Sequence, residues 1–361
     1  MLRAPGCLPV HRPLSDFMAR HPKQAERWKK VVHAFSDLSI TVLADLVADE
    51  FVFGEIARVS REAPVLILKH RQRTLVPGGG GNAIMNLASL GVSVLPVGVV
   101  GDDEPGHLLL EQMKAKKISI SGIERLKNHV TTTKTRILAG MSHTGRQQVV
   151  RIDREAEPLS ENHPVLLNLV RDAREYATAS DAFLVSDYGY GAATPRLLTF
   201  IKSNHCLDNK PITLDSRYRM LEFTGITAAT PNEPEVEEAL RIKIGQDDQK
   251  LLSAGARLMQ EMQLESLVVT RGRDGMVAFE DGAAPLSIPI FGSDQVADVT
   301  GAGDTVIATF TAALAAGADT ATGAYLANFA GGIVVTKRGT ATVSNLELLD
   351  AIDKYAAATS S

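Results

Sequence analysis

The chain has 361 residues, of which 45% are hydrophobic and 22% are charged, and its formal net charge at pH 7 is −4. This composition is typical of a globular protein, and the charge argues against nucleic acid or an acidic membrane as the main partner. The two cysteines, Cys7 and Cys206, lack the spacing of a disulfide framework or a metal site. No segment has the apolar length of a signal peptide or a membrane span, so we expect a cytoplasmic protein.

The chain divides into an N-terminal extension and one large domain. Residues 1–37 are predicted to be partly disordered, with a polar helix near 15–35 that packs on the domain or stays mobile. Residues 38–357 contain no internal repeat and no low-complexity linker. We therefore expect them to form a single domain.

Apolar strand-like segments alternate with amphipathic helices along this domain. Apolar runs that predict buried strands lie at 40–49, 92–103, 182–187, 211–215, 266–272 and 276–280. Helical patterns lie at 78–91, 234–244, 247–262, 301–317, 320–336 and 345–357. Such alternation predicts an α/β fold with a mainly parallel sheet flanked by helices. Less regular strands within 50–75 and 130–155 predict a small β appendage.

Polar residues follow several of the predicted strands. In open parallel sheets the carboxyl ends of the strands meet at one edge, where ligands bind. A protein without such a site also has polar strand ends, so this pattern alone leaves the question open. The strand-end residues are Asp45, Asp49, Asp102, Asp103, Asp187, Asp215, Thr270, Arg271 and Gly272.

The segment DVTGAGD at 298–304 places two glycines directly before a predicted helix. The free N–H groups at a helix start attract anions, and glycines let a phosphoryl group approach the backbone closely. Asp304 in the first turn is placed to take a proton from an attacking hydroxyl, as phosphoryl transfer requires. The alternative is an ordinary helix start capped by Thr300 or Asp298. No Gly-Lys-Ser/Thr follows, so the segment is not a Walker loop.

The glycine-rich segment PGGGGNAIMN at 77–86 has two interpretations. Gly78, Gly80 and Ala83 loosely match a dinucleotide-binding pattern, with Asp102 where a ribose-binding acid would stand. However, the preceding residues 71–77 make a poor central strand. We favour a glycine floor beneath a polyhydroxylated ligand, with Asn82 supplying hydrogen bonds.

Together these motifs resemble the ribokinase/PfkB family of sugar kinases. GGGGN near position 80, PNEPE at 231–235 and DVTGAGDT at 298–305 occur in the order typical of that family, and the resemblance covers about residues 38–350. ARVSREAPV, VVRIDRE and VSDYGYG further resemble the D-glycero-D-manno-heptose 7-phosphate kinases, without the nucleotidyltransferase domain that some of them carry. Those enzymes serve lipopolysaccharide core biosynthesis in the cytoplasm.

The resemblance implies a ribokinase-like fold with a small β lid, ATP and Mg²⁺ as cofactors, and a sugar or sugar phosphate as substrate. It also implies a homodimer formed through the lid, and it leaves a monovalent-cation site open. Asp304 would be the base, and the γ-phosphate would be bound by Gly301, Ala302 and Gly303. The expected sugar-binding residues are Asp45, Asp49, Gly79, Gly80, Asn82, Arg136, Arg151 and Asp187. The expected nucleotide-binding residues are Asn232, Thr270, Arg271, Gly272 and Asn328, with Glu235 organising Mg²⁺ through water.

Several of these residues have a second interpretation. Asp45 could simply end a strand, and the acids of PNEPE could begin an ordinary helix, where they are favourable. The basic residues either are solvated or bind an existing substrate phosphate: Arg58, Arg61, Lys134, Arg136 and Arg151.

The sequence also departs from the heptose kinases at several positions. Tyr190 stands where those enzymes usually have lysine, and Asp215-Ser216-Arg217 replaces their Asp-Pro-Lys. Three functions therefore remain open. The first is a kinase acting on the anomeric hydroxyl of a heptose 7-phosphate. The second is a ribokinase- or fructokinase-like kinase of an unphosphorylated sugar, and the third is a non-catalytic regulatory protein that binds sugar or nucleotide.

Overall fold

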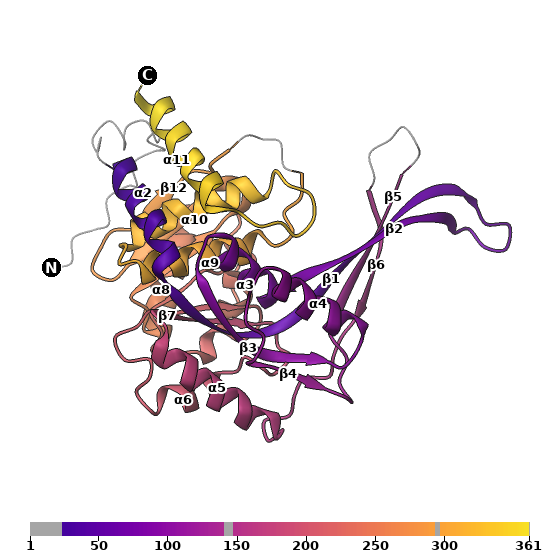
Figure 1. Cartoon of the computed structure of the whole chain (residues 1–361). Helices are drawn as coiled ribbons and strands as arrows, with labels where there is room; N and C mark the ends of the chain where they lie inside the picture. The colour runs from indigo at the N-terminus through magenta and orange to yellow at the C-terminus, as the bar shows by residue number, and fades with distance from the viewer. Residues whose placement is uncertain (1–23, 141–146, 293–296, 361) are drawn as a thin grey trace.

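In the computed structural model, which describes residues 24–140, 147–292 and 297–360, strands and helices alternate around a central sheet (Figure 1). The order of its strands is β12-β11-β10-β9-β8-β7-β1-β3-β4, and all neighbours from β10 to β4 are parallel. The strands β11 and β12 at one edge are antiparallel. The strands are β1 (Ser39–Val59), β3 (Ser93–Gly101), β4 (Ile123–Leu126), β7 (Ala182–Asp187), β8 (Ile212–Ser216), β9 (Ala228–Ala229), β10 (Ser266–Thr270), β11 (Met276–Glu280) and β12 (Leu286–Ile288).

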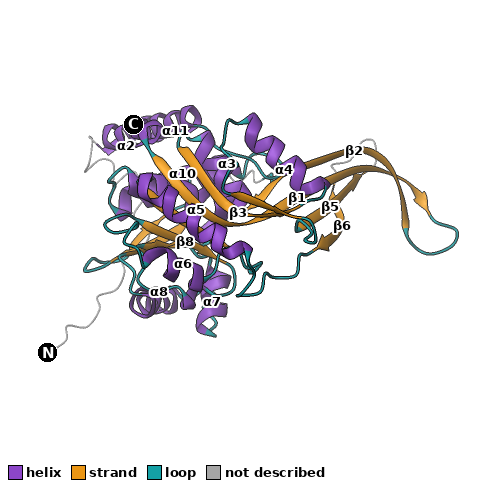
Figure 2. Ribbon diagram, turned by 60° about the horizontal axis from the view of Figure 1, so that its bottom comes forward, coloured by secondary structure: helices purple, strands orange, loops and turns teal. Residues whose placement is uncertain are grey.

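Helices cover both faces of this sheet, as Figure 2 shows. Successive strand residues enter opposite cores, so Val42 packs with one helix layer and Leu43 with the other. Burial on both faces explains why the strands are continuously apolar in sequence. One layer contains α2 (Gln24–Ala34), α3 (Gly80–Ser89), α4 (Glu104–Ala115), α9 (Ala302–Ala315), α10 (Thr320–Val334) and α11 (Asn345–Ser360). The other contains α5 (Val165–Ala179), α6 (Pro195–Lys202), α7 (Glu233–Leu240) and α8 (Asp248–Met262).

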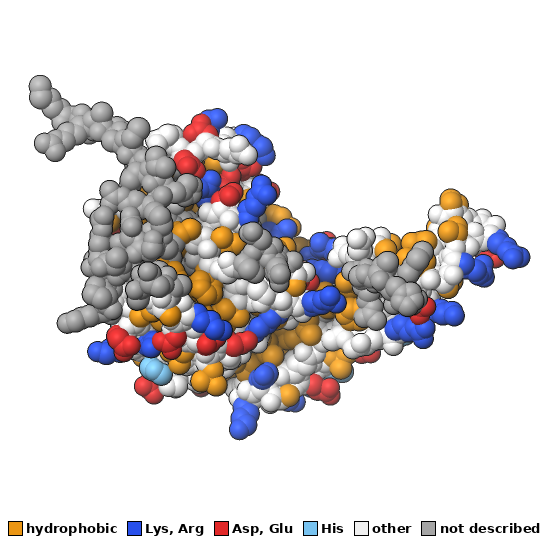
Figure 3. Space-filling view, turned by 90° about the horizontal axis from the view of Figure 1, so that it is seen from above, with side chains coloured by type: hydrophobic (Ala, Val, Ile, Leu, Met, Phe, Trp, Pro, Cys, Tyr) orange, Lys and Arg blue, Asp and Glu red, His pale blue; other side chains and the backbone are white. Residues whose placement is uncertain are grey.

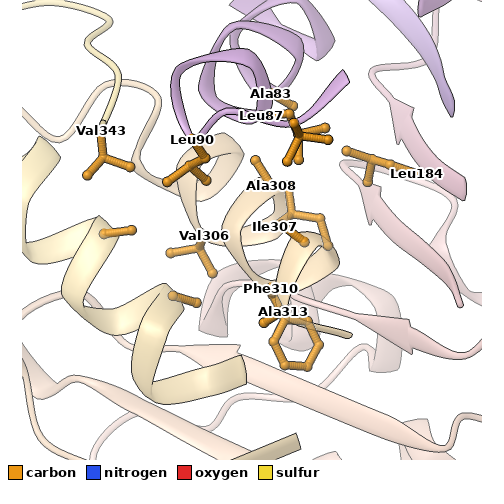
Figure 4. Packing of buried hydrophobic residues seen from close by; sticks show 14 of the residues in the cluster. Ala83, Leu87, Leu90, Leu184, Val306, Ile307, Ala308, Phe310, Ala313 and Val343 are labelled. Atoms are coloured by element: carbon orange, nitrogen blue, oxygen red, sulfur yellow. The ribbon is translucent and has the colours of Figure 1, made fainter. Parts of the chain in front are cut away.

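The helix α9 lies in the interior of the protein. Its small and apolar residues, among them Ala308 and Phe310, pack against Leu87 of α3, Leu90 directly after that helix and Leu184 of β7 (Figure 4). A helix that is apolar all round belongs in a core. Burial of α9 therefore fixes the position of its first turn at the edge of the sheet, where Asp304 is only 4% exposed.

The lid is a continuation of the central sheet. The strand β1 runs without interruption from the core into the lid, where it pairs with β2 (Leu66–Gly79) and β5 (Thr133–Gly140). The edge strand β6 (Gln147–Arg154) pairs antiparallel with β5. Figures 1 and 2 show the β1–β2 hairpin projecting far from the body. The predicted pieces at 40–49 and 51–59 are thus one strand, with irregular pairing at Phe53/Gly54 and Ile56/Arg58.

The glycine-rich segment is preceded by β2, a strand that the sequence did not predict to extend this far. Residues 71–79 belong to β2, which is antiparallel to β1, and α3 begins at Gly80. A dinucleotide-binding unit needs a parallel strand, a glycine turn and a helix. The structure therefore rules out the dinucleotide interpretation of Gly78, Gly80 and Ala83.

Part of the N-terminal extension is integral to the core. Of the helix predicted near 15–35, the described part is α2, and residues 1–23 lie outside the described residues. Trp28 of α2 is fully buried and packs against Tyr325 and Phe329 of α10, with ring centroids 5.1 and 5.4 Å away. Within the described parts of the chain, no helix combines the length and apolarity needed to cross a bilayer.

Candidate active site

The start of α9 has an unusual turn. Gly301 occupies the N-cap position with φ of +79°, and no side chain of the described residues caps the helix there. Asp298 instead closes the preceding loop, because its carboxylate accepts hydrogen bonds from the backbone N–H groups of Thr300 (3.0 Å) and Gly339 (3.1 Å). The capped-helix interpretation with Thr300 or Asp298 at the N-cap is therefore wrong. The N–H group of Ala302 donates to the Val299 carbonyl (3.3 Å), which leaves those of Gly303 and Asp304 for an anion.

Two side chains from distant segments hold the Asp304 carboxylate. The Asn82 amide donates a hydrogen bond of 2.9 Å to Oδ2, and the Tyr188 hydroxyl donates one of 2.8 Å to Oδ1. Burial raises the pKa of Asp304 to about 7, while these hydrogen bonds oppose the rise. A carboxylate with a pKa near neutrality suits a general base at physiological pH.

Gly301 is required for this arrangement. A Cβ atom at Gly301 would lie 2.4 Å from the amide nitrogen of Asn82, in addition to the strain of its positive φ. Because Gly301 has no Cβ atom, the Asn82 amide can also donate a hydrogen bond of 3.1 Å to the Gly301 carbonyl. The glycine-rich turn before α3 and the glycines before α9 therefore meet through Asn82. By contrast, a Cβ at Gly303 would point into open space.

Asp45 and Asp187, both predicted to bind substrate, make internal contacts. Asp45 accepts hydrogen bonds from the backbone N–H groups of the loop after β7, at Tyr188, Tyr190 and Ala192 (2.8–2.9 Å). Burial raises the pKa of Asp45 to about 6. Asp187 forms an ion pair with Arg219 and accepts a hydrogen bond from the Ser216 hydroxyl (2.8 Å). These contacts favour structural roles for both carboxylates. Asp45 does not end a strand, however, because β1 continues past it to Val59.

Asp49 lies where β1 enters the lid. Its carboxylate forms an ion pair with Arg136 and accepts a hydrogen bond of 3.0 Å from the Thr340 hydroxyl. It also faces Gly78, where a Cβ would lie 2.4 Å from Oδ2. Asp49 thus joins the lid to the glycine-rich turn and to the loop before α11.

Basic residues gather on the inner face of the lid. Arg136 and Arg151 are direct cross-strand partners on β5 and β6, and Lys134 lies two residues before Arg136. Since side chains alternate along a strand, all three share the face on which Arg136 meets Asp49. Arg151 forms an ion pair with Asp153 (2.7 Å), and burial lowers the pKa of Lys134. Figure 3 shows the concentration of Lys and Arg side chains along the projecting arm.

The residues predicted to bind nucleotide lie along the ends of β9 and β10. Asn232 caps α7 and forms a reciprocal capping box with Glu235, with both hydrogen bonds at 2.9 Å. Thr270 ends β10 beside Asn232, and Gly272 has φ of +55°. Arg271 forms ion pairs with Glu233 (3.2 Å) and Asp248 (3.0 Å). The acids of PNEPE thus begin a helix, as in their second interpretation, which leaves their role toward nucleotide untested.

The side-chain amide of Asn328 binds a loop carbonyl instead of contacting the other predicted nucleotide-binding residues. It is 3% exposed, and its amide donates a hydrogen bond of 2.8 Å to the Pro289 carbonyl. The side chain therefore stabilises the packing of α10 on the loop after β12.

Sequence reasoning assigned no role at this site to three residues, although it noted Asp215 as a strand end. Tyr188 contacts Asp304, Asp215 lies in β8, and Arg217 directly follows that strand. Burial and the charge of Asp304 raise the pKa of Asp215 well above its usual range. The available signal was position, because all three stand at the carboxyl ends of predicted strands.

Comparisons with known proteins agree with this geometry. The pfkB family carbohydrate kinase model matches residues 47–347. The chain is 38% identical over 315 residues to the bifunctional protein HldE of Geobacter metallireducens, and 36% identical over 319 residues to that of Desulfatibacillum aliphaticivorans. The two matches cover 87% and 88% of this chain, but only 62% and 63% of those relatives. The chain therefore spans less than two thirds of the length of these relatives.

Solved structures show the same fold at low sequence identity. Arabidopsis thaliana ribokinase, complexed with ribose and ATP, superposes with a TM-score of 0.68 at 19% identity, covering 87% of this chain and 98% of that one. Escherichia coli phosphofructokinase-2, in complex with substrates and products, gives a TM-score of 0.68 at 17% identity, covering 90% and 100%. The predicted ribokinase-like fold is confirmed, and the chain is a member of the pfkB family of carbohydrate kinases.

Proposed function

We propose that this protein transfers the γ-phosphate of ATP to a hydroxyl of a phosphorylated heptose, with Asp304 as the general base. The observation that carries the proposal is the buried Asp304 carboxylate in the first turn of α9, directly after an N-terminus that no described side chain caps. An anion site and a base thus lie within one helical turn. Phosphoryl transfer needs an anion site for the transferring phosphate and a base for the acceptor hydroxyl close to each other.

The chemistry follows from that placement. The acceptor O–H bond breaks as its proton passes to Asp304, and the acceptor oxygen forms a bond to the γ-phosphorus. The bond from the γ-phosphorus to the bridging oxygen breaks, which releases ADP. The backbone N–H group of Gly303 stabilises the negative charge of the transferring group, and that of Ala302, which donates to the Val299 carbonyl (3.3 Å), would have to turn toward the phosphate to contribute. A pKa near 7 lets Asp304 take this proton at neutral pH and return it to solvent.

The residues present fit a magnesium ion bound with ATP. Glu235 supplies hard carboxylate oxygens near the anion site, and burial raises its pKa, which a nearby cation would reverse. The described residues include no cluster of three or more His, Cys, Asp or Glu side chains arranged to hold a metal ion. Glu235 would therefore hold Mg²⁺ together with water and phosphate oxygens. When bound, the ion neutralises phosphate charge.

Basic residues near the lid support a phosphorylated acceptor. The charges of Arg151 and Arg217 add to burial in lowering the pKa of Lys134, and Arg217 also opposes the rise in the pKa of Arg151, as expected if the inner face of the lid lies close to the end of β8. A group of cations of this kind suits a phosphate dianion better than neutral hydroxyls. The resemblance to the heptose 7-phosphate kinases supports a heptose as the sugar and its anomeric hydroxyl as the nucleophile.

A homodimer through the lid is part of the same proposal. Val150 and Ile152 of β6 are 49% and 54% exposed, and they alternate with Arg151, so they lie on the outer face. Exposed apolar side chains on an edge strand suit contact with a second chain.

The first experiment measures ADP release from Mg·ATP against a panel of free and phosphorylated sugars, with Asp304→Asn in parallel. We expect turnover of a phosphorylated heptose, and a loss of at least about 10²-fold in the variant. Turnover of free ribose or fructose instead would favour the kinase of an unphosphorylated sugar. ATP binding without turnover of any sugar would favour the regulatory protein. A fully active variant would show that Asp304 is not the base.

A further inference from the structure

Tyr188 lies in the VSDYGYG segment, to which the sequence assigned no contact with Asp304, and its hydroxyl donates a hydrogen bond to that carboxylate. We propose that Tyr188 is a positioning residue, which holds Asp304 from the side opposite Asn82 in the orientation from which Asp304 takes a proton. This inference rests on the proposed function, in which Asp304 is the base. The contact joins the loop after β7 to the first turn of α9, 116 residues apart in sequence.

The backbone is shaped to seat the Tyr188 ring. Gly79 has φ of +52°, and a Cβ there would lie 3.1–3.3 Å from three carbon atoms of that ring. Any larger residue would therefore both strain the turn and press on the ring. The glycine-rich segment thus serves Asp304 twice, since Gly79 admits Tyr188 and Asn82 supplies the second donor.

The loop that carries Tyr188 is anchored by Asp45. This buried carboxylate accepts hydrogen bonds from the N–H groups of Tyr188 itself (2.9 Å), Tyr190 (2.9 Å) and Ala192 (2.8 Å). A carboxylate that gathers several backbone donors fixes the path of a loop. Asp45 therefore places Tyr188 rather than leaving its ring free to rotate away from Asp304.

Asn82 and Tyr188 together fix the plane of the Asp304 carboxylate. Each donor reaches a different oxygen, so rotation of the carboxylate would break both hydrogen bonds. A carboxylate offers about four acceptor positions, which leaves capacity for the hydroxyl of a sugar. Tyr188 can therefore orient Asp304 without displacing the substrate.

The charges around Asp304 make the Tyr188 hydroxyl more important. Besides burial, the negative charges of Asp49 of β1 and Glu235 of α7 raise the pKa of Asp304. Asp215 of β8 also interacts with Asp304, and burial and that interaction raise the pKa of Asp215 itself. From α3 and the loop after β7, Asn82 and Tyr188 oppose these charges by donating hydrogen bonds to the Asp304 carboxylate. Removing the Tyr188 hydroxyl should therefore raise the pKa of Asp304 further above 7.

The test replaces Tyr188 with phenylalanine, which keeps the ring and removes the donor. The acidic limb of the kcat/KM profile should move up by about one pH unit, because one hydrogen bond to a charged group is lost. At pH 7 this shift lowers kcat/KM about fivefold, and at pH 9 parent and variant agree within about twofold. Tyr190→Phe is the matched control, since its hydroxyl contacts Glu155 (3.1 Å) and its loss should leave the Asp304 titration unchanged.

A second measurement does not depend on activity. Carbon-13 NMR titration of aspartate carboxyls, with the Asp304 signal assigned by its loss in Asp304→Asn, gives the pKa of Asp304 directly in each variant. An upward shift in Tyr188→Phe alone supports the inference, even if no sugar is turned over and the proposed function fails. An unchanged Asp304 pKa together with an unmoved kcat/KM profile overturns it, while turnover by the parent would leave the proposed function intact.

Discussion

The floor of the active site and the lid above it hold their charged groups in opposite ways. On the floor, Asp304 is buried, and each carboxylate oxygen has a donor fixed by the fold. On the lid, Arg151 keeps 43% of its side chain exposed and pairs with Asp153 on its own strand. Long exposed side chains pay more entropy for a fixed position, but they adapt to the ligand.

This difference suggests a division of labour between the two regions. A base needs fixed geometry, because small displacements cost large factors in rate. Recognition of a phosphate tolerates movement, because several cations share the charge. Changes to the floor should therefore lower kcat, and changes to the lid should mainly raise KM for the phosphorylated sugar.

The largest effect is expected on the floor, from Gly301→Ala. The new Cβ would collide with the Asn82 amide and would hold an unfavourable positive φ, so both the anion site and the support of Asp304 would shift. We expect kcat to fall about 10²-fold, comparable to the loss of one donor from an oxyanion hole. Steady-state kinetics with ATP and the best acceptor from the sugar panel measures this loss.

Gly303→Ala is the matched variant two residues later. Its Cβ would meet open space and its φ is not positive, so the free energy of unfolding should match that of the parent. A Gly301→Ala protein as stable and active as the parent would show that Asn82 does not need the approach that Gly301 allows. If Gly303→Ala lost activity while keeping its stability, the space above Gly303 would be where the phosphate binds.

In the lid, Lys134→Met should change KM for the phosphorylated sugar rather than kcat. This change keeps a long side chain and removes a partly buried cation from the inner face. KM for the phosphorylated sugar should rise about tenfold, as expected for one charge-assisted contact, with kcat within about twofold of the parent. Initial rates over a range of sugar phosphate concentrations measure both parameters.

Lys69→Met tests whether the rise in KM depends on the position of Lys134 or only on the positive charge of the lid. Lys69 lies on β2 in the same lid but is exposed, and it is paired in register with Glu55. It should leave KM unchanged. Equal increases in KM for the two variants would mean that the lid attracts the substrate only through its overall charge, and salt would then abolish the effect.

The sequence predicted the elements that form the floor of the site better than the side-chain contacts between those elements. Most buried strands and the turn before α9 follow from local patterns and were placed within a few residues. However, β1 extends to Val59 instead of ending near 49, and α4, α5 and α6 were not predicted. Asn82 was predicted to bind the sugar, which stays a prediction, whereas its contact with Asp304 joins positions 222 residues apart. Such a contact depends on how α3 and α9 pack, which no local pattern shows.

The strand-end carboxylates illustrate the same limit. Position at the end of a parallel strand places Asp45 and Asp187 at the correct edge of the sheet. It does not say what their oxygens contact. In the structure these carboxylates bind backbone N–H groups and Arg219, so they support the loop and strand that surround the site. No local pattern indicates that the Tyr188 hydroxyl contacts Asp304, so the sequence could not distinguish this residue from other loop tyrosines.

The last expected effect is on stability rather than on activity, and it comes from the floor again. Burial holds the pKa of Asp304 at about 7, above the value of about 3.9 for an unfolded chain. Between these values the native protein keeps a proton that the unfolded chain releases, so the free energy of unfolding falls as pH rises. Asp304→Asn removes this penalty. Its gain in the free energy of unfolding should grow from near zero at pH 4 to on the order of 4 kcal/mol at pH 8, since each pKa unit corresponds to about 1.4 kcal/mol.

Denaturant unfolding of parent and variant at several pH values measures this gain. An asparagine can accept from Asn82 through its oxygen and donate to the Tyr188 oxygen through its amide, so no buried polar group should lose its partner. Asp350→Asn on the exposed face of α11 is the control and should show no such trend. A gain that is equal at all pH values would locate the stabilisation in packing instead. A gain that grows with pH would show that burying the Asp304 carboxylate in the floor lowers stability, whereas an exposed lid cation such as Arg151 carries no such cost.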